Sequence, residues 1–319
     1  MENILVIGCA GQIGTELTME LKKIYGNEHV IGTDINKIPS VIAVNGPHET
    51  LDILDKKALQ KIVRKYKIDG IVNLAAILSA VGEKNPLLAW DVNMNGLINV
   101  FEVARQENVQ RVLTPSSIAV FGPETPQENT PQETILRPKT MYGITKVAGE
   151  LLGDYYVEKY GMDIRGLRYP GIISHEALPG GGTTDYAVAI YYDAIKHKKY
   201  TSFVKADTVL PMMYMPDCLS ATIQLFRADK KNLKHHGDYN LAAMSFTVEE
   251  LAQSIKKHIP EFEIEYKPDH RQAIADTWPK SIDDSAAREE WGWQHKYDLD
   301  KMTKDMLVNL QAKYDKNLI

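Results

Sequence analysis

Hydrophobic residues form short runs along the first half of the chain, and longer segments with apolar residues every three or four positions separate these runs. Short apolar runs predict buried strands, and the three-to-four spacing predicts helices. The predicted strands are Ile4–Gly8, Val30–Thr33, Gly70–Leu74, Val112–Pro115 and Ile164–Arg168. The helices predicted between them are Ile13–Ile24, Lys56–Tyr66, Pro86–Gln106 and Met141–Tyr160.

This alternation is typical of an α/β fold, with a doubly wound parallel sheet covered by helices on both faces. The pattern weakens after residue 170. Asp217–Leu225 predicts a helix that returns to the first domain, and Leu299–Lys313 predicts a final helix. We therefore expect a first domain over residues 1–173, to which 211–230 return, and a smaller interleaved C-terminal α+β lobe from 174–210 and 231–319.

Composition narrows the class of protein. The 319 residues carry 37 Lys and Arg against 42 Asp and Glu, which gives a net charge of −5 and no basic surface for nucleic acid. Apolar runs fall short of the ~20 residues of a membrane span. The first strand follows Met1 almost directly, which leaves no room for a secretion signal. Cys9 and Cys218 give no disulfide framework, and the histidines show no metal-ligand spacing. We expect a cytoplasmic protein without metal, nucleic-acid or membrane partners.

A glycine-rich turn joins the first predicted strand to the first predicted helix. Gly8, Gly11 and Gly14 form the pattern G-x-x-G-x-x-G, and this strand–turn–helix context makes it specific for a dinucleotide. The glycines allow a tight turn, close approach to a pyrophosphate and close helix packing. Asp34 ends the second strand, where its carboxylate would bond the adenosine ribose and repel a 2′-phosphate. The motif predicts a Rossmann domain that prefers NAD to NADP.

Two further strand ends carry residues suited to the cofactor. Asp52 and Ile53 follow a third candidate strand as the acid-and-aliphatic pair that often contacts adenine, and a solvated loop is the alternative explanation. Small side chains follow Asn73, which lets the backbone run past a ribose. The cofactor contacts predicted there are Leu74, Ala75 and Ala76.

The spacing Tyr-x-x-x-Lys occurs four times, so its context must select one match. Only Tyr142 and Lys146 begin a helix downstream of a strand that ends in hydroxyl residues. One helical turn places the two side chains on the same face, and the ammonium would hold the phenol pKa below its free value of about 10. Ser117 would hold the reacting oxygen. We predict Tyr142 as the general base.

These residues together resemble the extended short-chain dehydrogenase/reductase superfamily over essentially the whole chain. The resemblance implies that Lys146 also holds the nicotinamide ribose. It implies further cofactor contacts at Gln12, Ile13 and Asn93. Tyr169, Pro170 and Ile172 follow the strand that ends at Arg168 and are expected to line the nicotinamide; a turn that leaves the sheet is the alternative.

Two features separate the chain from sugar-nucleotide enzymes of this superfamily. Ser117 is followed by Ile118 and Ala119, whereas the 4,6-dehydratases have Asp-Glu there. Leu210 stands where 4-epimerases have an arginine that grips the substrate phosphates. A sugar-nucleotide 4-epimerase and an inactive NAD-binding regulator remain the alternatives, and the intact Ser117, Tyr142 and Lys146 argue against the regulator.

Longer segments closely resemble the short-chain L-threonine 3-dehydrogenases. They are Tyr169–Ser174, Leu178–Ala187, Leu210–Asp217 and Trp278–Asp284. The resemblance implies NAD-dependent oxidation of L-threonine to 2-amino-3-oxobutanoate, on a route toward glycine or aminoacetone. Gly180–Gly182 would be a lid hinge.

Four residues are expected near a zwitterionic amino acid. Thr183 and Thr184 precede the predicted helix Asp185–Lys196 and suit a carboxylate, with the resemblance favouring Thr184 and helix capping as the alternative. Ser79 would reach the polar groups of the substrate, and Trp278 would close the pocket unless it is simply core. Met212, Met213 and Met215 form either an adaptable pocket wall or a plain core strand.

The two long helices Pro86–Gln106 and Met141–Tyr160 are expected to pair with their copies across a two-fold axis, as in this superfamily. Leu151, Tyr155 and Tyr156 offer more apolar surface there than one sheet face needs. The expected assembly is a homodimer.

Overall fold

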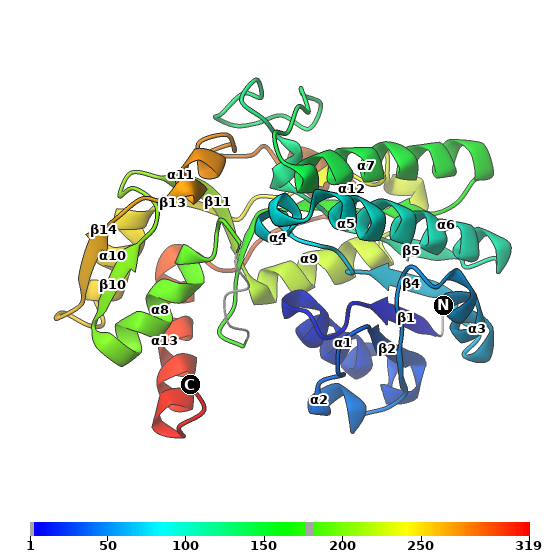
Figure 1. The fold of residues 1–319 in the computed structure, drawn as a ribbon, viewed down its shortest axis with the longest axis horizontal. Helices are drawn as coiled ribbons and strands as arrows, with labels where there is room; N and C mark the ends of the chain where they lie inside the picture. Colours follow the sequence, from blue (N-terminus) through cyan, green and yellow to red (C-terminus); the bar gives the residue numbers. More distant parts are fainter. Residues whose placement is uncertain (1–2, 177–181) are drawn as a thin grey trace.

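The computed structural model describes residues 3–176 and 182–319, which form one α/β body with a six-stranded parallel sheet (Figure 1). The strand order is β3-β2-β1-β4-β5-β7, and it reverses between β1 and β4, as in a doubly wound sheet. The six strands are β1 (Ile4–Ile7), β2 (Val30–Asp34), β3 (His48–Thr50), β4 (Gly70–Asn73), β5 (Arg111–Leu113) and β7 (Ile164–Arg165). The predicted doubly wound α/β fold is confirmed.

The central strands are buried on both faces because successive side chains point to opposite sides. Leu5 and Ile7 belong to a core under α3 (Lys56–Lys65), α6 (Gly96–Gln106) and α7 (Met141–Tyr160). Ile4 and Val6 belong to a second core under α1 (Gln12–Tyr25) and α9 (Met215–Arg227). Helix α9 therefore returns to cover the same sheet face as α1, as the sequence predicts (Figure 1).

A third hydrophobic core lies beside the sheet, toward the C-terminus of the chain (Figure 1). Its helices are α8 (Tyr186–His197), α10 (Val248–Lys256), α11 (His270–Ala275) and α13 (Leu299–Asp315). Helix α12 (Ser285–Trp291) instead contributes to the second core and packs on the short strand β12 (Tyr239–Asn240). Its small sheets pair β10 (Lys199–Ser202) with β14 (Glu263–Tyr266), and β11 (Val209–Tyr214) with β9 (Gly171–Ile173) and β13 (Met244–Thr247).

The predicted strand over 164–168 is two strands in the structure. It breaks at Gly166 between β7 and β8 (Leu167–Tyr169), and β8 pairs with β6 (Ser116–Ser117) and β12 (Tyr239–Asn240) in a separate small sheet. A Cβ at Gly166 would lie 2.3 Å from the carbonyl oxygen of Gly237 and 2.6 Å from that of Thr114. The backbone is thus squeezed between two other segments, which bends the strand away from the central sheet.

The predicted helix over 86–106 is also interrupted. Short helices α4 (Ser79–Lys84) and α5 (Pro86–Trp90) precede a π-helical turn over Asp91–Asn95, and α6 continues after it. A π turn shifts the register of a helix and is common at functional sites. Here it carries Asn93, whose amide oxygen accepts from the Ile77 amide at 2.8 Å and whose amide group donates to Thr145 Oγ1 at 3.1 Å.

Candidate active site

A cavity of about 280 Å³ opens at the carboxyl ends of β1, β4, β6 and β8. Parallel strands place their functional residues at this edge. The cavity brings together most residues predicted for the site: Gly8, Gly11, Gln12, Ile13, Gly14, Leu74, Ala76, Ser79, Ser117, Tyr142, Lys146, Tyr169, Pro170, Ile172, Thr183, Thr184 and Trp278. Asp34, Asp52, Ile53, Ala75 and Asn93 are outside its lining.

The glycine-rich loop has the shape that a pyrophosphate requires. Gly8 has a φ of +86°, and a Cβ there would lie 2.8 Å from the Ala75 nitrogen. A Cβ at Gly14 would lie 2.0 Å from the Gly8 carbonyl oxygen, so only glycine allows α1 to start this close to β1. Gly11 is the N-cap of α1 and provides no side-chain cap, which leaves the first amides of the helix for an anion. This cradle fits a dinucleotide.

Asp34 lies at the end of β2 beside this loop. Its carboxylate accepts from the amide of Ala10 at 2.9 Å and from the amide of Asn36 at 2.8 Å. Both oxygens are held in place, so the negative charge is fixed next to the glycine loop. That position suits ribose hydroxyls and opposes a phosphate.

The other predicted adenosine contacts lie further out. Ile53 is buried against Gly96, and Asp52 is exposed, where it accepts from the amide of Leu54. Ala75 and Asn93 line a smaller cavity next to Lys146. In the structure Asn93 ties the segment after β4 to α7, because it also donates to the Ile77 carbonyl oxygen at 3.1 Å.

Tyr142 and Lys146 lie one turn apart at the start of α7, and Ser117 lies at the end of β6. Thr140 caps the helix by accepting from the amide of Gly143. Ser117 and Tyr142 both line the cavity. Lys146 Nζ lies 5.5 Å from the centre of the tyrosine ring and donates to the Pro115 carbonyl oxygen at 2.7 Å. A phenol, a hydroxyl and an amine therefore converge on the cavity.

The expected effect of Lys146 on the phenol is not present in the protein alone. Burial raises the pKa of Tyr142 to about 12, although the nearby Ser117 hydroxyl opposes the rise. Burial also lowers the pKa of Lys146 to about 8, against the attraction of Glu150. Desolvation disfavours the charged form of each group. Contrary to the prediction from the sequence, the protein without its cofactor therefore does not lower the pKa of the phenol.

The opposite end of the cavity carries hydroxyl groups and one carboxylate. Thr183 is buried, and its hydroxyl has no hydrogen-bond partner among residues 3–176 and 182–319, so it is free to bind a ligand there. Helix α8 begins at Tyr186 with Asp185 as its N-cap, and neither threonine side chain caps it. Ser79 is buried at the start of α4, and Trp278 is buried at the cavity wall.

The cavity lining identifies residues that the sequence did not single out. Asp185 lines it and accepts from the amide of Gly182 at 2.7 Å, and Leu78 contributes to the wall. Of the described lining residues, Asp185 is the one carboxylate and Lys146 the one cation. Asp185 lies in the segment Leu178–Ala187, but the sequence predicted no role for it, because it reaches the cavity only through the turn ahead of α8.

Several other residues that the sequence analysis singled out do not line the cavity. Met212, Met213 and Met215 are buried core residues and do not line it. Leu210 is also fully buried in the core, so no cation for a diphosphate stands there. Gly180, Gly181 and Leu178 lie outside the described residues, so the expected hinge over Gly180–Gly182 is described only at Gly182. Across residues 3–176 and 182–319, no three His, Cys, Asp or Glu side chains gather as a metal site.

The family is decided by a comparison with known proteins. The model of the NAD-dependent epimerase/dehydratase family matches residues 4–242. The chain belongs to this family. It is an NAD-dependent dehydrogenase of the extended short-chain dehydrogenase/reductase superfamily, and the glycine cradle described above fits its cofactor. No helix in the described part of the chain is both long and apolar enough to cross a membrane.

Several known proteins are similar to this dehydrogenase over nearly its whole length. An uncharacterized epimerase/dehydratase of Staphylococcus haemolyticus is 50% identical, over 98% of this chain and 99% of its own. A crystal structure of L-threonine dehydrogenase from Phytophthora infestans is 53% identical with a TM-score of 0.94, over 98% of this chain and 99% of its own. A structure named monomeric L-threonine 3-dehydrogenase, from a metagenome, is 51% identical with a TM-score of 0.93, over 97% and 99%.

Proposed function

We propose that this dehydrogenase oxidises the β-hydroxyl of L-threonine to give 2-amino-3-oxobutanoate. The observation that carries the proposal is the convergence of Ser117, Tyr142 and Lys146 on one cavity, because a phenol beside a hydroxyl and an amine suits the oxidation of a substrate hydroxyl. The rest of the lining combines apolar side chains with a few hydroxyl groups, which suits a small polar substrate. The names of the solved relatives support the same substrate.

In the proposed mechanism Tyr142 is the general base. Bound NAD⁺ supplies the hydride acceptor. Ser117 holds the substrate hydroxyl against the phenolate, and Tyr142 takes its proton while the hydride leaves Cβ. Lys146 stays protonated beside the phenolate and holds the ribose. The cofactor contacts are those predicted from the sequence, from Gly8 to Ile172, with Asp34 as the residue that selects NAD.

At the substrate end, Thr183 and Thr184 bind the carboxylate. The buried, unpaired hydroxyl of Thr183 supports this, because a ligand oxygen there would complete its hydrogen bonding. Ser79 reaches the polar groups of the amino acid, and Trp278 closes the wall. Residues 1–173 with 211–230 form the unit that binds NAD, and 174–210 with 231–319 form the lobe that closes over the substrate.

The biological setting that we propose is cytoplasmic threonine breakdown, toward glycine or aminoacetone, by a homodimer. Exposed apolar side chains support the dimer, because they gather on α5, α6 and α7. They are Leu87, Leu88, Trp90, Ile98, Ile144, Leu151 and Tyr155. Tyr156 does not join them, since it is buried and donates to Glu102 at 2.9 Å.

The experiment that tests the proposed reaction is the rate of NADH formation with NAD⁺ and a panel of substrates. L-threonine should give the highest kcat/KM, with L-serine and 3-hydroxybutyrate far lower, because each lacks one group that the cavity contacts. UDP-galactose should neither compete nor be converted to UDP-glucose, since Leu210 leaves no cation for its diphosphate. That conversion is measured by chromatography of the sugar nucleotide, because epimerisation returns the hydride and forms no net NADH. Turnover of UDP-galactose, or no reaction with L-threonine, would refute the assignment.

A further inference from the structure

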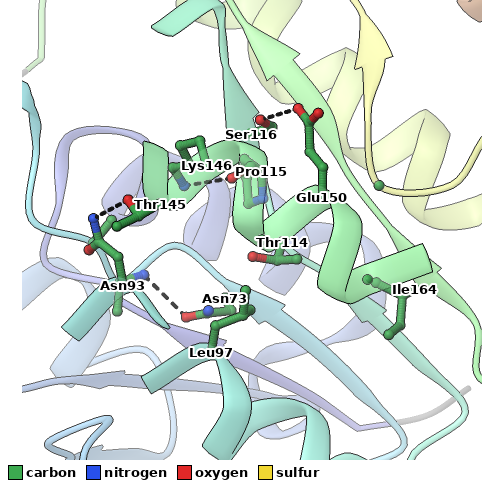
Figure 2. A pocket seen from close by; sticks show the side chains of 15 residues that line it. Asn73, Asn93, Leu97, Thr114, Pro115, Ser116, Thr145, Lys146, Glu150 and Ile164 are labelled. Atoms are coloured by element: carbon green, nitrogen blue, oxygen red, sulfur yellow. Dashed lines mark hydrogen bonds between the residues drawn. The ribbon is translucent and has the colours of Figure 1, made fainter. Parts of the chain in front are cut away.

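A second, smaller cavity of about 30 Å³ lies next to the active-site cavity, and Figure 2 shows its lining. This lining includes Lys146, Ser116, Thr145, Asn93 and Glu150. Lys146 and Ser116 line both cavities. This volume exceeds the ~10–15 Å³ that one water molecule needs, and polar groups surround it.

Glu150 is the acidic group of this cavity, and it lies one helical turn beyond Lys146 on α7. Its carboxylate is buried and accepts from Ser116 Oγ and from Arg168, with Nε at 3.0 Å and Nη2 at 2.9 Å. Figure 2 shows Ser116, Glu150 and Lys146 around the same space. A buried carboxylate of this kind needs both a cation and hydrogen bonds to remain charged.

The partners of Glu150 connect three catalytic elements. Ser116 precedes Ser117 on β6, Arg168 precedes Tyr169 on β8, and Glu150 itself shares α7 with the base and the lysine. A side chain that ties these three elements together controls where the reacting groups stand.

We propose that Glu150 is a positioning residue for the dehydrogenation, which fixes the ends of β6 and β8 and, across the small cavity, keeps Lys146 protonated. The proposal rests on the function proposed above for Tyr142 and Lys146. Two states of the site contain the same number of protons: a neutral Tyr142 phenol with a neutral Lys146 amine, and a Tyr142 phenolate with a Lys146 ammonium. Only the second state contains the base, so the protein must favour it. The charge of Glu150 does so, because it stabilises the ammonium more than it opposes the more distant phenolate.

Other charged groups near α7 are paired elsewhere. Glu83 of α4 accepts from the amide of Met141 at the start of the helix, and Asp91 of the π turn accepts from Asn95. Asp238 binds Arg168 at 3.3 Å. Arg165 of β7 is paired with Asp163 at 2.7 Å.

Two further groups titrate nearby. Burial beside Asp238 and Glu150 raises the pKa of Asp154 to about 6, so it is charged throughout the alkaline range. Burial lowers the pKa of His236, which is therefore neutral in that range. Glu150 is then the buried carboxylate that shares the cavity with Lys146.

The test compares Glu150→Gln with the wild type in two measurements. The first is the pH profile of kcat/KM for L-threonine oxidation. We expect its alkaline limb to move at least about 0.5 pH unit lower and its maximum to fall, because Lys146 loses its proton at lower pH once the charge of Glu150 is removed. The second is the pKa of Lys146 itself, from competitive acetylation read by mass spectrometry. It should fall by a similar amount.

Further variants separate charge from packing. Glu150→Asp keeps the carboxylate, so the alkaline limb of its pH profile should return to the wild-type position. This should hold even if the shorter side chain lowers the melting temperature. Glu290→Gln is the matched control: Glu290 is equally buried but binds Tyr239 and His235, and its loss should leave the profile in place. Should Glu150→Gln not fold, Glu150→Gln with Arg168→Gln carries the same comparison, because the buried ion pair is then removed as a whole. Asp238 loses Arg168 but keeps its hydrogen bond from Gln132.

The proposal would be overturned if Glu150→Gln lost rate equally at all pH values while the alkaline limb and the pKa of Lys146 stayed unchanged. Glu150 would then be a purely structural residue. The acetylation measurement does not depend on turnover. An inactive wild type in which Glu150→Gln still lowers the Lys146 pKa would therefore refute the proposed function and retain this inference.

Discussion

In the proposed mechanism, Tyr142 changes from a neutral phenol into a base. In the protein alone its pKa is about 12 and that of Lys146 about 8, so at neutral pH the phenol is protonated and the lysine charged. A bound cationic nicotinamide adds the missing positive charge and lowers the phenol pKa. Activity should therefore rise from neutral pH into the alkaline range as Tyr142 ionises, and decline once Lys146 loses its proton. A rate that is flat from pH 6 to pH 10 under conditions where chemistry limits would contradict this role.

Removing the phenol tests the same residue by substitution. Tyr142→Phe should reduce kcat by at least ~10²-fold, because general-base catalysis is lost, while NAD⁺ binding measured by fluorescence quenching changes little. Tyr155→Phe is the matched control on the same helix, where Tyr155 is exposed and paired with Lys159. Ser117→Ala should reduce kcat less, and Lys146→Ala should weaken both turnover and NAD⁺ binding. A Tyr142→Phe enzyme with a tenth of its activity would mean that another residue is the base.

Asp34 is expected to set the choice of cofactor. Its fixed charge should make kcat/KM for NAD⁺ at least about 10²-fold higher than for NADP⁺, since like charges repel strongly where water is scarce. Asp34→Ala should reduce that ratio. Glu28→Gln removes a charge at the other, exposed end of β2 and should leave it intact. Equal use of both cofactors by the wild type would refute this role.

At the scale of elements, the contact between α1 and β1 is the most sensitive to a single methyl group. Gly14→Ala would place a Cβ 2.0 Å from the Gly8 carbonyl oxygen, so α1 must move away from the phosphate cradle. We expect at least a tenfold weaker affinity for NAD⁺ and a lower melting temperature. Gly153→Ala on α7 is the control, because its Cβ meets nothing nearer than 3.5 Å. Unchanged NAD⁺ affinity in Gly14→Ala would show that the cradle does not hold the phosphates.

Local sequence patterns predict the bounds of an element well where residues of that same segment determine where it begins and ends. Helix α7 matches its predicted range, because Thr140 caps one end and Gly161 ends the other. The breaks at Gly166 and over Asp91–Asn95 could not be predicted, since they depend on Gly237 and Ile77 from distant parts of the chain. The roles of Asp185 and Glu150 could not be predicted for the same reason, because only the folded chain brings these residues to the cavities.

At the scale of the whole molecule, the apolar side chains exposed on α5 to α7 predict a dimer built as a four-helix interface. Sedimentation at micromolar concentration should give twice the mass of one chain, and Leu151→Glu should give a monomer. Leu151 is 64% exposed, and Val308 on α13 is similarly exposed at 60%, so Val308→Glu is the control and should remain dimeric. A monomeric wild type would place this chain with the relative that is named monomeric.

We propose that this protein removes a hydride from Cβ of L-threonine. L-threonine with deuterium at Cβ tests this step when the mass of the reduced cofactor is measured by mass spectrometry. Each reduced cofactor should gain one deuterium, and Tyr142→Phe should form it at least ~10²-fold more slowly. A reduced cofactor without deuterium, or none formed from L-threonine, would contradict the proposed reaction.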